Sequence, residues 1–313
     1  MAAQALVSQE DSTRSRGRPE GSRALQDNRS DRMAARGWFS ASCARAIQHV
    51  SFIPDAGKAM TALRIGIAGI NGRLGRLCAE EIEARGLVLT GGLSRTADPA
   101  RRITDDAAAL ARGCDVVIDV SHPDAIAHHA RVFAEAGCGW VLGTTGLDDM
   151  AQTAVLAVAT TIPVLQAANF APGLTMLLDL ARQLGAALPA GAYDAEIVET
   201  HHRQKLDAPS GTALAIGAAV SEGRGVSLAD VKRVDRTGRR QDGEIGFASL
   251  RAGQIVGEHS LILTSATEQI TLSHRAFDRR VFADGAVQAA CWLAGRQPGL
   301  YGMRDVLGLT RGA

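Results

Sequence analysis

Between residues 63 and 166 the sequence alternates short apolar runs with longer amphipathic stretches, and no other feature constrains the fold as much. Residues 123–137 and 148–159 have helical character. The strand-like runs are residues 63–68, 87–93, 116–120, 140–143 and 162–166. Strands that alternate with helices form parallel sheets, because each helix returns the chain to the end from which the next strand starts. We therefore expect an α/β domain with a parallel sheet.

The first apolar run is followed by a glycine-rich turn, Gly69-Ile70-Asn71-Gly72-Arg73-Leu74-Gly75, and then by an amphipathic stretch. A turn of this kind brings the backbone close to a pyrophosphate and aims helix N-terminal N–H groups at its charge. Its GxxGxxG spacing differs from the commoner GxGxxG, and glycine turns also serve plain packing of helix on strand. Together with the parallel sheet, the turn predicts a dinucleotide-binding domain of the Rossmann type.

Ligands of such sheets bind beyond the carboxyl ends of the strands, so the loops that follow the strands should line one crevice. The second strand ends in Ser94-Arg95. An acidic residue at this point binds the ribose hydroxyls of NAD, whereas a nearby arginine accommodates the 2′-phosphate of NADP. The pair therefore favours NADPH, although an arginine in an exposed loop can also be plain solvated surface.

The densest chemistry lies in residues 199–213, Glu-Thr-His-His-Arg-Gln-Lys-Leu-Asp-Ala-Pro-Ser-Gly-Thr-Ala, after a strand expected at 193–198 and before a helix. Ser210 is a good N-cap residue, so the N–H groups of Gly211 and Thr212 should be available to an anion. Lys205 adds a positive charge, and His201 and its neighbour His202 titrate near neutral pH. The stretch predicts a site for a small anion with a proton donor beside it.

Two alternatives apply to this stretch. The histidines can simply end a strand while Lys205 forms a surface pair with Asp207. Zinc binding is disfavoured, because adjacent residues of an extended segment point to opposite sides and no Cys or HExxH partner lies near. We predict no metal site.

These motifs resemble those of the 4-hydroxy-tetrahydrodipicolinate reductases, NAD(P)H-dependent enzymes of lysine and diaminopimelate biosynthesis in bacteria and plants. The resemblance runs from about Leu63 to Leu309, and its most specific part is the His-His-Arg-x-Lys-x-Asp-Ala-Pro-Ser-Gly-Thr string. Family members often carry an acidic residue where Ser94 stands. The family therefore implies use of both NADPH and NADH, and Ser94-Arg95 favours NADPH.

The resemblance also implies roles for individual residues. His201 would be the proton donor or acceptor and Lys205 a second donor, while His202, Lys205, Gly211 and Thr212 would contact the carboxylates of a small dicarboxylate substrate. The cofactor would be bound by Gly69, Ile70, Asn71, Gly72, Arg73, Leu74, Arg95, Gly143, Thr144, Thr145, Ala167, Ala168, Asn169 and Phe170.

The implied architecture is a Rossmann-type domain formed by residues 60–170 and 279–313, with a smaller α+β domain at 171–278 for substrate binding and oligomerisation. Its open mixed sheet would build a homotetramer. Within it, residues 245–250, 255–263 and 269–272 are strand-like, with a turn at Ala252-Gly253 between the first two. Arg251, Glu258 and His259 could line the site, but a charged strand rim is the commoner explanation, and we leave them out of the predicted catalytic set.

Two other functions are compatible with the cofactor domain. An inactive NADP-binding regulatory protein should have lost parts of the His-Lys block, which is intact. A dehydrogenase for an amino acid or a semialdehyde should lack the Asp207-Ala208-Pro209-Ser210-Gly211-Thr212 loop, which is present. Reductase chemistry is therefore the leading hypothesis.

The composition of the chain limits its possible binding partners and its location in the cell. The chain has 34 Lys plus Arg against 33 Asp plus Glu, so its net charge of +1 points to neither nucleic acid nor an anionic membrane. Five singly spaced cysteines argue against a disulfide framework and favour a reducing, cytoplasmic location. Residues 1–59 have no sustained hydrophobic period, and we expect a disordered extension there rather than a folded targeting or partner-binding segment.

Overall fold

The computed structural model describes residues 63–234 and 236–309. The segment 1–59, for which the sequence predicts disorder, lies outside the described residues, so that expectation stays a prediction. Among the residues that are described, no helix combines the length and the apolar character needed to cross a membrane.

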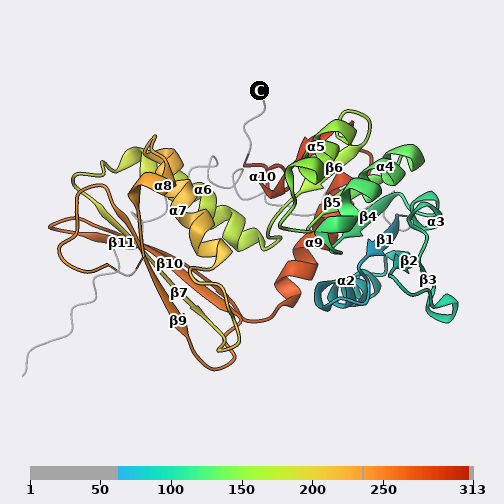
Figure 1. Cartoon of the computed structure of the whole chain (residues 1–313), viewed down its shortest axis with the longest axis horizontal. Coiled ribbons are helices and arrows are strands. Elements are labelled where there is room, and N and C mark those ends of the chain that lie inside the picture. Colours follow the sequence, from blue (N-terminus) through green and yellow to red (C-terminus); the bar gives the residue numbers. More distant parts are fainter. Residues whose placement is uncertain (1–62, 235, 310–313) are drawn as a thin grey trace, which may run out of the picture. The chain divides into compact units, whose positions relative to one another are not determined.

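A seven-stranded sheet has the order β12-β6-β5-β4-β1-β2-β3, and strands β1 to β6 of it are labelled in Figure 1. Every neighbouring pair in it is parallel, which confirms the α/β class expected from the strand and helix alternation. Its strands are β1 (Arg64–Ala68), β2 (Val88–Leu93), β3 (Ile103–Thr104), β4 (Val116–Asp119), β5 (Gly139–Leu142), β6 (Pro163–Gln166) and β12 (Gly299–Tyr301).

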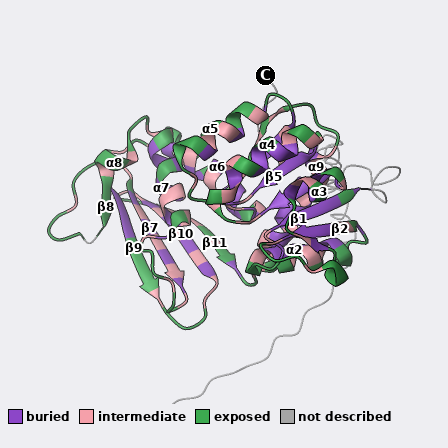
Figure 2. Cartoon of the chain, turned by 45° about the vertical axis from the view of Figure 1, so that its right-hand side comes forward, coloured by how far each residue is buried: buried purple, intermediate pink, exposed green. Residues whose placement is uncertain are grey.

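Helices cover both faces of this sheet, and its central strands are buried (Figure 2). One face packs Ile65 and Ile67 against apolar side chains of α2 (Arg73–Ala84) and α9 (Arg280–Leu293). The opposite face packs Val117 and Trp140 against α3 (Ala107–Arg112), α4 (Ile126–Ala136) and α5 (Asp149–Val158). Burial on both faces explains why these strands are continuous apolar runs rather than alternating ones.

The second sheet is mixed and has five strands in the order β11-β10-β7-β9-β8. Strand β10 is antiparallel to β7 and to β11, whereas β9 is parallel to β7 and to β8. Its apolar core includes side chains of two helices, α6 (Pro172–Ala187) and α7 (Gly211–Gly223). The strands are β7 (Asp194–His201), β8 (Lys232–Val234), β9 (Ile245–Arg251), β10 (Gly257–Thr264) and β11 (Gln269–Ala276). A short helix, α8 (Leu228–Val231), precedes β8.

The turn predicted at Ala252-Gly253 does not close a hairpin. Strands β9 and β10 are not neighbours, because β7 lies between them. The connection therefore crosses the end of β7, where Ala252 N–H donates to His201 O at 2.9 Å and Arg203 N–H donates to Gly253 O at 3.2 Å. A turn is present at Gly253-Gln254, close to the predicted position, and the crossing brings residues of β9 and β10 to the end of β7.

Several element boundaries also differ from the expected ones. Strand β7 continues to His201, so Glu199 and His201 belong to the strand and not to the loop after it. The last described helices are α9 and the short α10 (Met303–Val306), and between them β12 joins the edge of the parallel sheet beside β6. The predicted domain limits at residues 170 and 279 are compatible with this return of the chain and stay predictions.

Helix α9 packs closely on the segment that leaves β6. A Cβ built on Gly285 would lie 1.9 Å from the backbone oxygen of Phe170, and this oxygen belongs to the main chain, which cannot turn aside as a side chain can. We predict that Gly285→Ala lowers the stability by about 1–3 kcal/mol through overpacking, despite a helix propensity gain of about 1 kcal/mol. Denaturant unfolding measures the difference.

The matched control is Gly191→Ala, since a Cβ there would meet no atom within 4 Å. Equal stability of the Gly285→Ala and Gly191→Ala proteins would contradict the close packing of α9.

Candidate active site

The residues predicted to bind the cofactor follow the carboxyl ends of four strands of the parallel sheet, β6, β5, β1 and β2. The glycine turn is tightly folded: Gly69 has φ +83°, and a Cβ on it would lie 2.7 Å from the backbone oxygen of Val120. A Cβ on Gly75 would lie 2.2 Å from the oxygen of Gly69. Both positions therefore require glycine, and the turn lets helix and strand approach closely.

Helix α2 begins directly after this turn with Gly72 as its N-cap, which has no side chain to satisfy the helix N–H groups. The first turn of α2 carries no acidic residue, and Asn71, Gly72 and Arg73 are exposed. Free N–H groups at an exposed helix N-terminus suit a phosphate group. The residues present therefore fit the pyrophosphate of a dinucleotide cofactor.

The end of β2 is tied to the glycine turn, since Asn71 Nδ2 donates to Ser94 Oγ at 3.0 Å and Gly69 N–H donates to Leu93 O at 3.0 Å. The next residue, Arg95, is exposed. Among the described residues no carboxylate lies within ion-pair distance of its guanidinium. Arg95 thus offers an uncompensated positive charge beside the turn.

A buried carboxylate organises the loops after β4 and β5. Asp119 is fully buried at the end of β4 and accepts hydrogen bonds from Ser121 Oγ at 2.6 Å and Trp140 Nε1 at 3.3 Å. His129 Nδ1 lies 2.7 Å from its Oδ2. The backbone oxygen of Asp119 also accepts from Gly143 N–H at 2.8 Å. This network holds the start of the loop after β4 at Ser121 and the start of the loop after β5 at Gly143. The sequence analysis assigned no role to Asp119.

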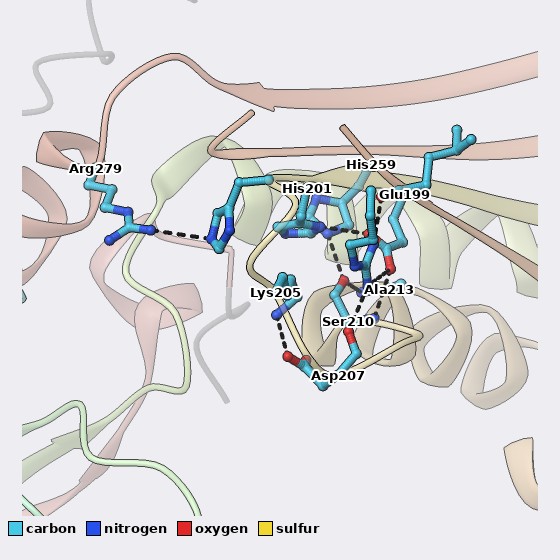
Figure 3. A network of polar contacts seen from close by, with 11 residues as sticks. Glu199, His201, Lys205, Asp207, Ser210, Ala213, His259 and Arg279 are labelled. Carbon is cyan, nitrogen blue, oxygen red and sulfur yellow. Dashed lines mark hydrogen bonds and ion pairs between the residues drawn. The ribbon is translucent and has the colours of Figure 1, made fainter. Parts of the chain in front are cut away.

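On the second sheet, strand register gathers a polar group on one face. Glu199 and His201 are two residues apart on β7 and so point to the same side. Pairing places His259 of β10 opposite Glu199 and Arg251 of β9 opposite His201. The group lies at the N-terminus of α7, beside Ser210 (Figure 3).

Glu199 is the centre of this group. Its side chain is only 1% exposed, and Arg251 donates to both of its oxygens, at 2.9 Å and 2.8 Å. His201 Nδ1 lies 2.6 Å from Oε2, and Ser210 N–H donates to Oε1 at 3.2 Å. Arg251 is also bound to the loop, because its guanidinium donates a further hydrogen bond to the backbone oxygen of Asp207 at 2.6 Å.

The charges within the group follow from these contacts. Burial alone would raise the pKa of Glu199, but the hydrogen bonds from Arg251 and then from His201 outweigh it and lower the pKa to about 2. Burial holds the pKa of His201 below its usual value against the opposing effect of Glu199. Burial and then the charge of His201 lower the pKa of His259 to about 4. At neutral pH Glu199 is therefore ionised and both histidines are neutral.

Ser210 closes the group on the helix side. Its Oγ accepts from Ala213 N–H at 3.1 Å and lies 3.0 Å from His259 Nε2. No group among the described residues accepts a hydrogen bond from the N–H of Gly211 or of Thr212. The helix start that was expected from the sequence is confirmed, and of its first two residues Gly211 is exposed and Thr212 is half-buried.

Lys205 and His202 lie in the loop between β7 and α7. Lys205 Nζ forms an ion pair with Asp207 Oδ1 at 2.8 Å, with 20% of the lysine side chain exposed. Arg279, which precedes α9, places a guanidinium nitrogen 3.5 Å from His202 Nε2 (Figure 3). Lys205 of the loop and Arg279 before α9 thus place two cations near His202, which makes no hydrogen bond to Glu199.

The structure thus sorts the predicted residues into two sets. His201, Lys205, His202, Gly211 and Thr212 lie together around the start of α7, and the predicted cofactor residues lie on the loops of the parallel sheet. No hydrogen bond or ion pair joins the two sets within residues 63–234 and 236–309. The roles assigned to these residues stay predictions.

The interpretation of Arg251 and His259 as a strand rim was wrong. Both belong to the Glu199 group, and His259 is only 5% exposed. Glu258 fits the rim interpretation, because it is half-buried and forms an ion pair with the exposed Arg275. An alternation signal was available in the sequence, since residues 257 and 259 lie on the buried side of β10 and 258 lies on the other.

A parallel sheet whose first strand leads through a glycine turn into a helix is typical of nicotinamide-dependent oxidoreductases. The family model described as "Dihydrodipicolinate reductase, N-terminus" matches residues 63–170, and the one described as "Dihydrodipicolinate reductase, C-terminus" matches residues 173–307. The chain belongs to the dihydrodipicolinate reductase family.

Individual relatives agree with this assignment. A protein of Gluconobacter oxydans (strain 621H) named 4-hydroxy-tetrahydrodipicolinate reductase is 71% identical over 248 residues, which cover 79% of this chain and 98% of the relative. A protein of the same name from Acidiphilium cryptum (strain JF-5) is 60% identical over 250 residues, with the same coverage.

A solved structure confirms the fold. The dipicolinate-bound dihydrodipicolinate reductase from Paenisporosarcina sp. TG-14 superposes with a TM-score of 0.65 at 22% sequence identity, covering 78% of this chain and 99% of the other.

The contacts of Ser210, the N-cap of α7, can be tested by mutation. We predict that Ser210→Ala lowers the stability by about 1–2 kcal/mol, because both the Ala213 N–H and His259 lose a partner. Thermal or denaturant unfolding measures the loss. Ser227→Ala is the matched control, since Ser227 is the N-cap of α8 but makes no side-chain cap hydrogen bond. A loss of similar size in both variants would show that the Ser210 contacts contribute nothing specific.

Proposed function

We propose that the protein reduces 4-hydroxy-tetrahydrodipicolinate to tetrahydrodipicolinate in lysine and diaminopimelate biosynthesis, with NADPH preferred over NADH. The observation that carries the proposal is the position of His201. This neutral, largely buried histidine is held by an ionised carboxylate next to Lys205 and the start of α7, where Ser210 is the N-cap and the Gly211 and Thr212 N–H groups are free. The names of the relatives supply the substrate, and the dipicolinate bound to the Paenisporosarcina protein is a dicarboxylate of the same class.

The reaction replaces the 4-hydroxyl of the substrate by hydrogen, so it consumes one hydride and one proton and releases water. A bound dihydronicotinamide supplies the hydride. The protein must orient the ring, neutralise two carboxylates and supply the proton. Correct orientation contributes several kcal/mol of barrier lowering, on the order of the effective-molarity range.

Each task has a candidate group around the start of α7. The free N–H groups of Gly211 and Thr212, together with Lys205 and His202, would bind the carboxylates. Lys205 can exchange its ion pair with Asp207 for one with the substrate. His201 would give or take a proton at Nε2, because its Nδ1–H is directed to Glu199.

The cofactor preference rests on Arg95. A 2′-phosphate placed beside it would form a charge-assisted pair, and no carboxylate of the described residues competes for the guanidinium. Ser94, which is bound to Asn71, supplies no negative charge that would repel this phosphate.

Two broader proposals follow from the family. The face of the mixed sheet that does not pack on α6 and α7 carries half-exposed residues such as Val198 and Ile262, which supports a homotetramer built on this sheet. The described cysteines Cys78, Cys114, Cys138 and Cys291 are free thiols, which supports a cytoplasmic location.

The direct test is the oxidation of NADPH, followed by its absorbance, with the product of the preceding synthase as substrate. Pyruvate, aspartate semialdehyde and the synthase generate this product in the cuvette. We expect NADPH consumption only when all three are present. Tight NADPH binding without consumption would instead favour the inactive NADP-binding protein.

Variants of the site residues test the assigned roles. We predict that Lys205→Ala and His201→Ala each lower kcat by roughly 10² or more, because each removes a charge or proton donor that acts in the transition state. The dissociation constant of NADPH should hardly change. Lys232→Ala, which removes an exposed lysine from β8, is the control and should behave as the parent. A comparable loss of NADPH binding in Lys205→Ala would place Lys205 in the cofactor site and overturn its assignment.

The cofactor preference has its own test. A single charge-assisted contact contributes about 1.5–3 kcal/mol, so kcat/KM should favour NADPH over NADH by about tenfold to a hundredfold. The preference should weaken at high salt, because Arg95 is exposed. We predict that Arg95→Ala largely abolishes it. A parent enzyme that favours NADH, or an unchanged ratio in Arg95→Ala, would reduce Arg95 to solvated surface.

A further inference from the structure

Glu199 has no part in the proposed reaction, yet it is the most highly connected side chain of the site. It is 1% exposed and accepts hydrogen bonds from Arg251 on both oxygens, with His201 and the Ser210 N–H as further partners. Leaving a charge in such a place without partners would be costly, so the four contacts are mutually dependent. The arrangement is too complete to be explained by packing of the strand alone, because apolar residues would fill the same position at lower cost.

The contact between Glu199 and His201 determines which imidazole nitrogen can react. An ionised carboxylate has no proton to donate, so Nδ1 of His201 must carry the hydrogen of the 2.6 Å contact. The lone pair of the neutral ring therefore lies on Nε2. A Cβ on Gly257 would lie 3.0 Å from this Nε2, so the glycine at the start of β10 leaves the reactive edge of the ring uncovered.

We propose that Glu199 is a positioning residue of the reaction, which holds His201 in one orientation and tautomer with Nε2 open for proton transfer, while Arg251 holds Glu199 and the backbone of the substrate loop. This inference rests on the proposed role of His201 as the proton-transfer group. It assigns functions to two residues on separate strands, neither of which touches the reacting atoms.

The charges around His201 give the proposal a distinctive consequence. From β7 it faces Glu199, from the loop Lys205 with its partner Asp207, from β9 Arg251, and from β10 His259, whose ring centroid is 5.0 Å away. Glu199 raises the pKa of His201, whereas burial, Lys205 and Arg251 lower it. Removing the charge of Glu199 should therefore lower this pKa, and removing the charge of Arg251 should raise it.

The experiment is an NMR titration of the histidine rings in the full-length chain, with the His201 signal assigned by its loss in His201→Gln. We compare the parent with Glu199→Gln and Arg251→Gln. The expected result is a fall of the His201 pKa by about one unit in the first variant and a rise of about one unit in the second. A general loosening of the site would move both in the same direction, towards the value of a solvated histidine, and would overturn the proposal. Unchanged values in both variants would overturn it as well.

Two further measurements keep the test decisive. The control Glu258→Gln removes a carboxylate from β10 that pairs with Arg275 at 2.9 Å and not with His201, and it should leave the His201 pKa unchanged. If a single variant fails to fold, the double variant Glu199→Leu with Arg251→Met removes both charges and leaves neither buried alone. Its ¹⁵N ring shifts should show loss of the Nδ1–H tautomer; retention of that tautomer would overturn the proposal.

The titration requires no turnover, so it is independent of the substrate assignment. If the titration gives the expected opposite shifts and the synthase-coupled assay gives no NADPH oxidation, the proposed function fails while the control of His201 by Glu199 stands. In an active enzyme, Glu199→Gln should lower kcat with little change in the KM for NADPH. The pH at which kcat falls should move to lower pH, because His201 then loses its proton at lower pH.

Discussion

The ionised carboxylate of Glu199 links β7, β9 and the start of α7 in the half of the chain built on the mixed sheet. Strand β7 supplies it, β9 supplies Arg251, and the start of α7 supplies the Ser210 N–H. Arg251 extends this link to the backbone oxygen of Asp207 in the middle of the loop. Because three segments depend on one buried ion pair, breaking it should cost about 3–5 kcal/mol and loosen the loop before the sheet.

The cofactor side follows the same principle with a different residue. Asp119 is a buried carboxylate at the carboxyl end of β4, and its hydrogen bonds to Ser121 and Trp140, with the close contact to His129, fix the loops beside the glycine turn. Both halves therefore have a buried carboxylate with several hydrogen-bond partners near the end of a strand, just before a loop. Loops held in this way can present backbone N–H groups to anions without a reorganisation cost at each turnover.

Local pattern was enough to predict the parallel sheet, the glycine turn and the helix start at Ser210, because each is encoded by neighbouring residues. Strand order is not local, so the sequence predicted a turn between β9 and β10 but not that β7 lies between these two strands in the sheet. The same reason explains the site. His201 and Lys205 stand in one contiguous motif, whereas Arg251 and His259 reach Glu199 only through the register of distant strands.

The claim that one buried ion pair anchors the loop is tested most directly by amide hydrogen exchange in the parent and in Glu199→Gln. We expect faster exchange in residues 202–213 of the variant, with the strands of the parallel sheet protected as in the parent. Unchanged protection of residues 202–213 in a folded Glu199→Gln protein would contradict it.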